Sequence, residues 1–400
     1  MPHVHRAAWV LPIVGPPIRN GWVSVADGRV VALGSANGDA TPDVAILPGL
    51  VNAHIHLELS WMRGKLPPGD SMPAWAERLI NLRLTESAGG PSLIVAAIDE
   101  VRASGTALVG DVTNGLASYG PLASSALSAA VFLELIGFNP AYATPLMDAA
   151  TLQIGELTPV DRLRVSIVPH GPYSVSADLM RSIARASRGR PISIHLAESS
   201  DELRFLKDGT GPWRSLLERR GVWTPAARVP GCGPVEYLDR FGLLTERLIA
   251  VHAVHLTDKE LAHLASVGAT VVTCPRSNRW TGAGDPPIER FYAAGLRVAI
   301  GTDSLASVDD LSMFEEMKMV RRLAPAVAAR DILHSATLAG ARALGFDGEL
   351  GAIQPGVRAE LIAVRLPAGP LTADDVEEYL VGGVPPADIS WLTAAGASTP

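Results

Sequence analysis

Short apolar runs alternate with longer stretches of helical periodicity through the middle of the chain. The runs are apolar on both faces, as in buried parallel strands, and the stretches between them are long enough to serve as crossover helices. Eight such runs occur, at Gly49–His56, Thr106–Asp111, Ala130–Leu135, Leu163–His170, Pro191–His195, Leu248–His252, Ala269–Cys274 and Arg297–Asp303. Because eight strand–helix units make a TIM barrel, the pattern predicts an α/β chain with a (β/α)8 barrel.

Three of the stretches between the runs have the length and polarity of crossover helices: Ser92–Ser104, Ser176–Ser187 and Asp258–Val267. The segment Asp208–Pro234 is instead rich in glycine and proline, which predicts a long barrel loop. Long ordered loops are often functional.

Both ends of the chain have β character. Trp22–Ala26 and Arg29–Leu33 flank an Asp-Gly pair, and Asp-Gly between two β-rich runs predicts a hairpin. Near the other end, Ala359–Val364 follows a Gln-Pro-Gly turn and is predicted to be a strand. We therefore expect a small β-sandwich formed by 1–48 and 349–400, and the barrel in 49–348.

Composition limits the class of protein. The chain is 48% hydrophobic and 19% charged, which supports a sizeable core. A net charge of −7 gives no basic footprint, so we expect a small-molecule substrate and no nucleic acid. Two cysteines, no signal-peptide pattern and no long apolar stretch indicate a soluble, cytoplasmic protein without membrane contact. A homodimer is expected only from the general frequency of such assemblies.

Polar residues that can bind a metal stand where the predicted barrel strands end. His54 and His56 close the first run, and alternation along a strand points both imidazoles the same way. His195, His252 and Asp303 end the fifth, sixth and eighth runs. One such residue is weak evidence, but strand ends converge at the mouth of a barrel. Three histidines and a carboxylate suit Zn²⁺ or a similar ion, with a position left for water.

Two further residues lie close to these strand ends. Glu198 follows His195 by three residues and can reach the same cavity as a proton donor, although alone it could equally be a solvated or helix-capping glutamate. Cys274 ends the seventh run, and we expect a buried small residue there rather than a ligand.

Five motifs make the chain resemble the amidohydrolase superfamily, in its cytosine/purine deaminase and chlorohydrolase branch. They are Leu47–His56, Ile194–Glu198, Val251–Leu256, Cys274–Asn278 and Gly301–Ser304. The resemblance spans nearly the whole chain, and the set is specific for the superfamily but less so for the substrate.

The resemblance implies roles for the strand-end residues. The metal ligands would be His54, His56, His195 and Asp303. Asp303 would also take a proton from the attacking water, and His252 would polarise that water or the developing charge. Glu198 would protonate a ring nitrogen of the substrate. The ligand types suit Zn²⁺ first, with Fe²⁺ as the alternative.

Lysine positions bear on the number of metals. Related barrels with two metals often bridge them with a carbamylated lysine on strand four, but no lysine lies between Lys65 and Lys207. Glu134 is the only obvious substitute, so we expect one divalent ion.

Within the branch, His56–Ser60 and Cys274–Arg279 look most like the aminodeoxyfutalosine deaminases of menaquinone biosynthesis. This implies hydrolytic deamination of 6-amino-6-deoxyfutalosine, with adenosine, S-adenosylhomocysteine and methylthioadenosine types as alternatives. A related C–N or C–Cl hydrolase is the first rival, but Glu198 favours deamination because the ring nitrogen and leaving amine both need a proton. An inactive scaffolding relative would have no reason to keep the whole set.

Substrate contacts are predicted on weaker grounds. His170 lies in a stretch that resembles the source of a substrate-contacting histidine in adenosine-type deaminases. Those enzymes often carry an acidic residue near the position of Arg83 that binds the ribose hydroxyls. Here Glu58 or Glu134 would replace it, or else the substrate is not a ribonucleoside.

Two more residues are predicted at the mouth. Arg276 would face the cavity just beyond the seventh strand, although a surface arginine is nearly as plausible. Trp75 would stack on the base from a covering loop, although simple packing would explain it as well.

Overall fold

A computed structural model describes residues 2–36, 41–87, 89–224 and 226–392. Within them, parallel strands form two four-stranded sheets, ordered β5-β6-β7-β8 and β12-β11-β10-β9. The strands are β5 (Leu50–Ile55), β6 (Thr106–Thr113), β7 (Ser128–Leu135), β8 (Leu163–Pro169), β9 (Ile192–Leu196), β10 (Leu248–His252), β11 (Thr270–Thr273) and β12 (Arg297–Ile300). All eight predicted runs are thereby confirmed as strands.

Backbone hydrogen bonds join the two sheets at both edges. Between β8 and β9, the N–H of His195 donates to the carbonyl oxygen of His170 at 2.9 Å. Beyond the end of β12, the N–H of Asp303 donates to the carbonyl oxygen of His54 in β5 at 3.0 Å. The strands thus follow one another around an α/β unit of the TIM-barrel type.

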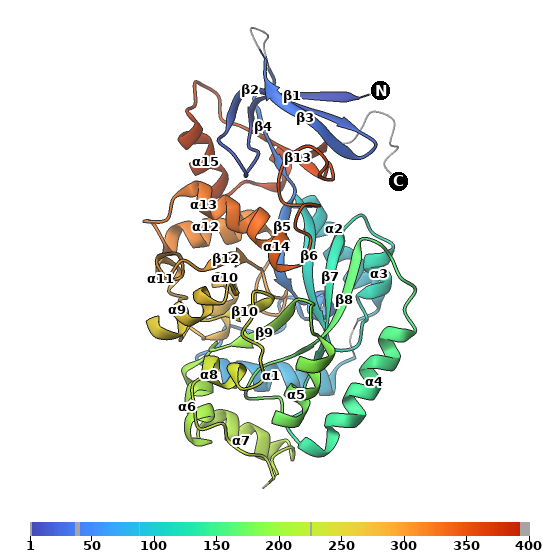
Figure 1. Ribbon diagram of the computed structural model, residues 1–400, viewed down its shortest axis with the longest axis vertical. Helices are drawn as coiled ribbons and strands as arrows, with labels where there is room; N and C mark the ends of the chain where they lie inside the picture. The colour runs from blue at the N-terminus through green and yellow to red at the C-terminus, as the bar shows by residue number, and fades with distance from the viewer. Residues whose placement is uncertain (1, 37–40, 88, 225, 393–400) are drawn as a thin grey trace.

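Helices connect and cover these strands (Figure 1). They are α1 (Met72–Thr85), α2 (Pro91–Ala103), α3 (Tyr119–Ala123), α4 (Ala143–Gly155), α5 (Ala177–Ala186), α6 (Ser200–Asp208), α7 (Pro212–Arg219), α8 (Pro234–Asp239), α9 (Asp258–Ser266), α10 (Pro275–Thr281), α11 (Ile288–Ala293), α12 (Met313–Leu323), α13 (Ala329–His334), α14 (Gly340–Ala343) and α15 (Ala373–Val381), with helical turns at Leu57–Met62, Pro140–Tyr142, Ser335–Ala339 and Pro386–Asp388. The three predicted helices match α2, α5 and α9.

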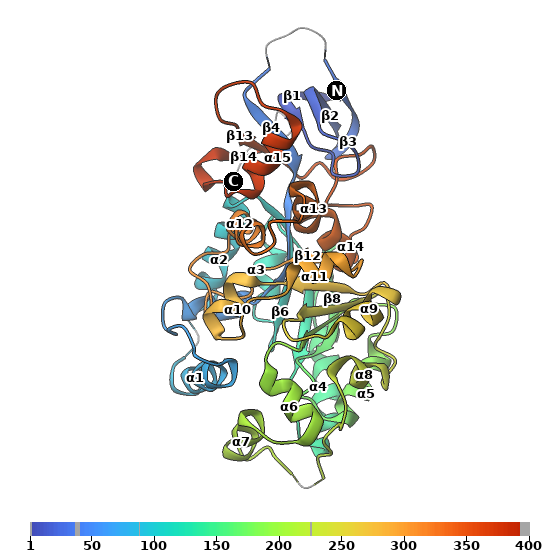
Figure 2. The same cartoon turned by 90° about the vertical axis from the view of Figure 1, so that its left-hand side faces the viewer.

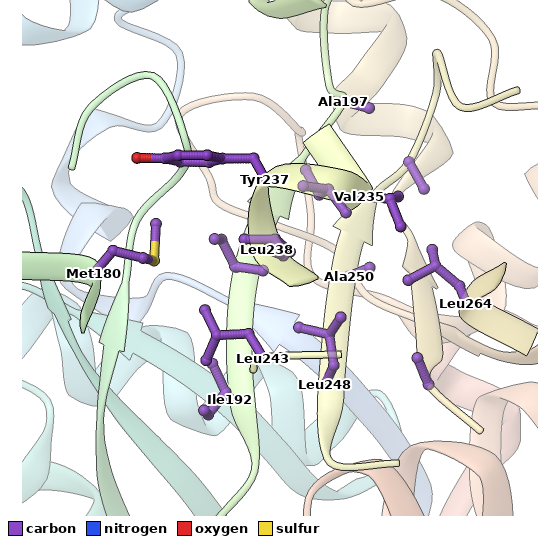
Figure 3. Close-up of a cluster of buried hydrophobic side chains, with 14 of the residues drawn as sticks. Met180, Ile192, Ala197, Val235, Tyr237, Leu238, Leu243, Leu248, Ala250 and Leu264 are labelled. Atoms are coloured by element: carbon purple, nitrogen blue, oxygen red, sulfur yellow. The ribbon is translucent and has the colours of Figure 1, made fainter. Parts of the chain in front are cut away.

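One large apolar core lies between the second sheet and its helices. Ile192 and Leu248 from β9 and β10 pack with Met180 of α5, Leu238 of α8 and Leu264 of α9 (Figure 3). All five side chains are buried. Because β9 carries His195 and β10 ends in His252, this packing fixes the strands that carry two of the candidate site residues.

The two ends of the chain lie side by side, away from α1 and α7 (Figures 1 and 2). They form one six-stranded sheet in the order β14-β13-β4-β1-β2-β3. Its strands are β1 (His3–Val10), β2 (Ile18–Ala26), β3 (Arg29–Ser35), β4 (Val44–Pro48), β13 (Leu361–Arg365) and β14 (Ile389–Leu392). The predicted pairing of the two ends is confirmed, but the described residues show one sheet and no second sheet facing it, as a sandwich would require.

The hairpin at the start of the chain is also confirmed. β2 and β3 pair antiparallel, and Asp27 and Gly28 between them have φ of 51° and 70°. Two successive positive φ values are typical of the tight turn that Asp-Gly favours.

The prediction of a loop over Asp208–Pro234 was wrong in part, because this segment contains α7. Pro212 occupies the first turn, where its missing N–H costs nothing. Trp213 and Leu216 are buried, whereas Glu218 and Arg219 are exposed, so the helix is amphipathic. Among the described residues, the helices are all too short or too polar to span a membrane.

Candidate active site

The carboxyl ends of the parallel strands bring the candidate residues together. His54 lies in β5, His195 in β9, His252 at the end of β10 and Asp303 just after β12. Gly301 permits the approach of β12 to β5, since a Cβ there would lie 2.7 Å from the carbonyl oxygen of His54. His252 and Asp303 have φ of 72° and 63°. Such strained backbone in non-glycine residues clusters at functional sites.

The four predicted metal ligands converge. Nε2 of His56 lies 3.6 Å from Oδ1 of Asp303, and Nε2 of His54 lies 4.0 Å from the same oxygen. Ligand atoms of His54, His56 and His195 all lie within 4.8 Å of one another, and so do those of His54, His252 and Asp303. The side chains thus surround a common point, as ligands of one ion do.

Unpartnered buried nitrogens test whether a metal fits there. Both ring nitrogens of His54, and Nε2 of His195, are buried without a hydrogen-bond partner among the described residues. Buried polar atoms normally have one. Burial, followed by the neighbouring imidazoles, lowers the pKa of His54 well below its usual value, so this histidine is neutral, as a metal ligand must be. The donor set therefore fits a divalent metal.

A chain of hydrogen bonds sets the tautomers of two histidines. With the Asn278 amide in this orientation, its oxygen can only accept, so Nδ1 of His252 donates to it at 2.7 Å. Burial lowers the pKa of His252 to about 4, which leaves Nε2 unprotonated. Nε2 then accepts from Nδ1 of His195 at 3.1 Å. In neutral His195, the lone pair of Nε2 is thereby left for a metal.

Glu134 stabilises positive charge at Nε2 of His195. Its Oε1 lies 3.4 Å from Nε2 of His195. Burial alone would lower the pKa of His195, but Glu134 outweighs burial and raises it to about 9. Either a proton or a metal ion bound at Nε2 can supply the positive charge that Glu134 stabilises. Glu134 itself is buried, which raises its pKa, yet His170 and His195 hold that pKa well below its usual range.

Glu198 has the environment of a proton donor. It is 3% exposed, and burial raises its pKa to about 7. Its Oε1 lies 3.6 Å from Nε2 of His252. The fully buried Glu202 fixes the backbone at this position. Its carboxylate accepts hydrogen bonds from the N–H groups of Ala197 at 2.8 Å and Glu198 at 3.0 Å. Ala197 has a φ of 50°, so these bonds fix a strained turn that points Glu198 at the site.

A serine orients Asp303. The hydroxyl of Ser277 donates to Oδ2 of Asp303 at 2.6 Å. This leaves Oδ1, the oxygen nearest His54 and His56, as the atom that faces the cluster. A carboxylate held at one oxygen presents the other in a defined direction, which suits both metal binding and proton transfer.

A cavity of about 470 Å³ opens above these residues. Its inner part is lined by His56, His170, His195, Glu198, Glu134 and Asp303. Apolar side chains of α1 and α7, including Leu79, Ile80, Leu216 and Leu217, line the outer part. Figures 1 and 2 show both helices at the end of the molecule opposite the six-stranded sheet. The cavity size is that of a pocket for a small organic molecule.

The structure brings only some predicted substrate contacts to the cavity. His170, Glu134 and Trp75 line it, but Trp75 stands on α1 rather than on the predicted loop. Glu58 does not line it and instead accepts from the Thr113 hydroxyl at 2.7 Å.

Arg276 does not line the cavity, against the prediction that it faces the mouth. Its guanidinium binds Asp310 at 2.9 Å and lies 3.7 Å from the fully buried Glu316. Two nearby carboxylates hold the side chain in an ion pair, which a strand-end position in the sequence does not reveal. Cys274 is fully buried and free, as expected.

Several site residues were missed from sequence. Ser277 and Asn278 belong to the Cys274–Asn278 motif. Their partners, Asp303 and His252, come from other parts of the chain. Arg83 and Asn114 line the cavity and bond to each other at 2.9 Å, and Nδ2 of Asn114 donates to Glu134 at 3.0 Å. For Arg83, the signal is its position, near which related enzymes often carry an acidic residue.

Comparison with known proteins agrees with this geometry. The model of the amidohydrolase family matches residues 45–389. An aminodeoxyfutalosine deaminase of Deinococcus radiodurans is 34% identical over 75% of this chain and 73% of its own length. A 5-methylthioadenosine/S-adenosylhomocysteine deaminase of Moorella thermoacetica is 30% identical over 97% of this chain and 91% of its own. A zinc-bound adenosine deaminase of Xanthomonas campestris superposes with a TM-score of 0.80 at 28% identity, covering 96% of this chain and 90% of its own.

Proposed function

We propose that the chain, which belongs to the amidohydrolase family and is a hydrolytic deaminase, uses a divalent metal to remove the exocyclic amine of an aminopurine nucleoside. The first candidate substrate is 6-amino-6-deoxyfutalosine, on similarity to the Deinococcus enzyme, which would assign the protein to menaquinone biosynthesis. The observation that carries the proposal is Glu198, a buried acid with a pKa near 7, at the floor of a cavity beside a cluster of metal-binding side chains.

We assign His54, His56, His195 and Asp303 as the ligands of one divalent ion, Zn²⁺ first and Fe²⁺ as the alternative. The unpartnered nitrogens of His54 and His195 support this assignment. When bound, such an ion supplies Lewis-acid activation of water, lowering the pKa of water from 15.7 to about 7.

Asp303 acts as the base. Because Ser277 holds Oδ2, the other oxygen is free to accept a proton from the attacking water. Nε2 of His252 lies 3.6 Å from Oε1 of Glu198, so we assign His252 to a position beside the same water. Removing the proton at the moment of attack avoids the build-up of positive charge on the water oxygen.

Glu198 acts as the acid. A carboxyl with a pKa near 7 is protonated in a large fraction of molecules at neutral pH, so it can give its proton to the ring nitrogen next to the carbon under attack. Protonation prevents negative charge on that nitrogen. Asp303 then returns its proton to the amine, which leaves as ammonia. The second proton of the water leaves the new hydroxyl as the carbonyl forms, and its return to Glu198 restores the acid. General acid–base assistance of this kind contributes about 10²- to 10⁴-fold.

A second candidate is a deaminase of methylthioadenosine or S-adenosylhomocysteine. Its support is the Moorella relative, which matches 97% of this chain. The chemistry would be the same, and only the group attached to the ribose would differ.

Ammonia release by metal-loaded protein tests the proposal. The panel is aminodeoxyfutalosine, adenosine, S-adenosylhomocysteine, methylthioadenosine, guanine and cytosine, with metal content measured on the same samples. Release from aminodeoxyfutalosine alone would support the first candidate, and release from several adenosines would support the second. No release from any compound, with the metal bound, would refute nucleoside deamination. A His54→Ala variant controls for contaminating activity, since it should lose both metal and turnover.

A further inference from the structure

A buried carboxylate lies beside the end of β5. Asp111 stands opposite Ile55 where β6 pairs with β5, and its side chain is fully buried. Its Oδ1 accepts the N–H of Leu57 at 3.0 Å, and its Oδ2 accepts the hydroxyl of Ser118. No cationic side chain among the described residues forms an ion pair with it. Because a buried charge is costly unless it is paired, these two hydrogen bonds have to compensate for its lost hydration.

The helical turn that follows β5 has no cap of its own. The turn Leu57–Met62 begins directly after His56, which occupies the N-cap position but makes no side-chain hydrogen bond to the turn. The imidazole of His56 instead lines the cavity, where its Nε2 lies 3.6 Å from Oδ1 of Asp303. The first N–H groups of a helical turn need acceptors, and aspartate is among the side chains that cap best. Asp111 therefore supplies, from the neighbouring strand, the acceptor that His56 does not provide.

Hydrogen bonds hold the backbone on both sides of His56. Its own N–H donates to the carbonyl oxygen of Asp303 at 3.2 Å, and the next N–H, that of Leu57, donates to Asp111. The two peptide groups that flank His56 are thereby fixed in the folded chain. Because the backbone sets the direction in which a side chain leaves it, the hydrogen bond from Leu57 helps to aim the imidazole.

We propose that Asp111 is a positioning residue, which holds the backbone after His56 so that the imidazole faces the other assigned metal ligands. This inference rests on the proposed function, because it takes His56 as a ligand. Asp111 does not line the cavity, so it acts through His56 rather than by touching the substrate. Ser118 supports it, since a carboxylate held at Oδ2 presents Oδ1 to Leu57 in a defined direction.

Two substitutions separate the acceptor from the rest of the side chain. Asp111→Asn keeps an oxygen that can accept the N–H of Leu57, whereas Asp111→Leu has a similar shape and no acceptor. Outer partners of metal-binding residues typically contribute about 10- to 100-fold in metal affinity. In competition with a chelator, the Zn²⁺ Kd of Asp111→Leu should therefore rise by that factor, and that of Asp111→Asn should stay close to the native value.

The geometry of the site is measured on protein loaded with Co²⁺. The visible absorption of Co²⁺ depends on the number and arrangement of its ligands, so it should change in Asp111→Leu and stay native in Asp111→Asn. A loss of global stability would not alter the spectrum of folded protein, and circular dichroism shows whether each variant is folded.

Ser104→Ala is the matched control. Ser104 is 3% exposed just before β6, at the opposite end of the strand from Asp111, and its hydroxyl donates to the carbonyl oxygen of Val101 at 2.9 Å. Removing this buried hydrogen bond should lower the urea midpoint of unfolding and leave the Zn²⁺ Kd and the Co²⁺ spectrum native. If Asp111→Leu does not fold, Ser118→Ala tests the same contact, since it leaves Oδ2 without its donor and should raise the Zn²⁺ Kd about three- to tenfold.

The two proposals fail in different ways. If the folded Asp111→Leu, or else Ser118→Ala, has the native Zn²⁺ Kd and Co²⁺ spectrum, Asp111 only stabilises the fold and the positioning role is wrong. An equal loss of affinity in Asp111→Asn and Asp111→Leu also overturns that role, because the charge rather than the acceptor for Leu57 would then matter. Neither result changes ammonia release by the native protein, so nucleoside deamination would stand. If the variants behave as expected but the native protein releases ammonia from no nucleoside, the deaminase proposal fails and the role of Asp111 stands.

Discussion

The inner and outer parts of the cavity are lined by different kinds of side chain. The strand-end cluster (His54, His56, His195, Glu198, His252 and Asp303) consists of polar groups. Residues behind it hold His252, Asp303 and the backbone of Glu198 through hydrogen bonds. The outer wall (the cavity-lining side chains of α1 and α7) is mainly apolar and partly exposed. One region meets its ligand through fixed atoms, the other through shape and contact area.

This difference separates chemistry from selectivity. Proton transfer needs groups held to within fractions of an ångström, so rigid strand ends and supporting partners suit it. Apolar contact depends weakly on exact position and changes by about 0.8 kcal/mol per methylene, so helices over the mouth suit it. Changes in the strand-end cluster should therefore alter kcat or metal binding, and changes in the outer wall should alter KM.

The largest effect is expected for Glu198→Gln, which replaces the proton-donating carboxyl group of the strand-end cluster by an amide. The amide keeps the shape but cannot give a proton, so kcat should fall by about 10²- to 10⁴-fold. Metal content and KM should stay near their native values, because Glu198 is not an assigned ligand. Steady-state ammonia release and metal analysis check this.

Glu236→Gln is the control for that experiment, since Glu236 is 65% exposed on α8. Turnover by Glu198→Gln within a few-fold of the native rate would contradict the role of Glu198 as the acid. A loss of metal together with turnover would mean that Glu198 supports the ligands instead.

A smaller effect is expected for Asn278→Ala, which removes the acceptor behind His252. Without it, His252 is free to adopt the other tautomer, and Nδ1 of His195 then loses its acceptor. Outer partners of metal-binding histidines typically contribute 10- to 100-fold in affinity, so metal Kd from competition with a chelator should rise by about that factor.

Added metal should restore part of the activity of Asn278→Ala, which an unfolded variant would not allow. Asn139→Ala, a change at an asparagine that caps a helical turn away from the cavity, is the control. An unchanged metal Kd in Asn278→Ala would show that the hydrogen-bond chain does not hold the tautomers.

The sequence predicted the strand-end cluster well for a physical reason. Strand alternation and the convergence of strand ends are fixed by backbone geometry, so His54, His56, His195 and Asp303 could be located without knowing any helix position. Their roles, and the division at 48/49 and 348/349, stay predictions.

The outer wall could not be predicted in the same way. The direction of Arg276 depends on Asp310 and Glu316, whose ion pairs form only in the folded chain. The contact of Arg220 with Asn81 likewise depends on how α7 lies against α1. The glycines and prolines around α7 indicated a loop because local composition outweighed a short amphipathic pattern.

The outer wall is tested by Ile80→Ala, which shortens a side chain that lines the cavity from α1. Loss of apolar contact should raise KM about three- to tenfold for a nucleoside with an apolar group on its sugar, such as methylthioadenosine, with kcat unchanged. KM for adenosine, which lacks that group, should change less. The control is Leu152→Ala, because Leu152 is 65% exposed on α4 and does not line the cavity. A fall in kcat with constant KM would mean that α1 acts on the chemistry.

The last expected effect is on stability rather than on activity, and it concerns Glu316, a fully buried acid on α12 near Asp303. Burial raises its pKa to about 8, against 4.5 in the unfolded chain, although Arg276 lowers it. Between these values the folded protein holds a proton that the unfolded chain has released. Its stability should therefore fall by up to about 1.4 kcal/mol per pH unit as pH rises from about 5 to 8. Glu316→Gln cannot titrate, so urea unfolding should show its stability rising relative to that of the native protein over this pH range.

Glu315→Gln, at a more exposed neighbouring position, should show no such relative rise. Parallel stability curves for Glu316→Gln and the native protein would mean that Arg276 keeps Glu316 ionised throughout, and that the region behind the strand-end cluster holds a full ion pair.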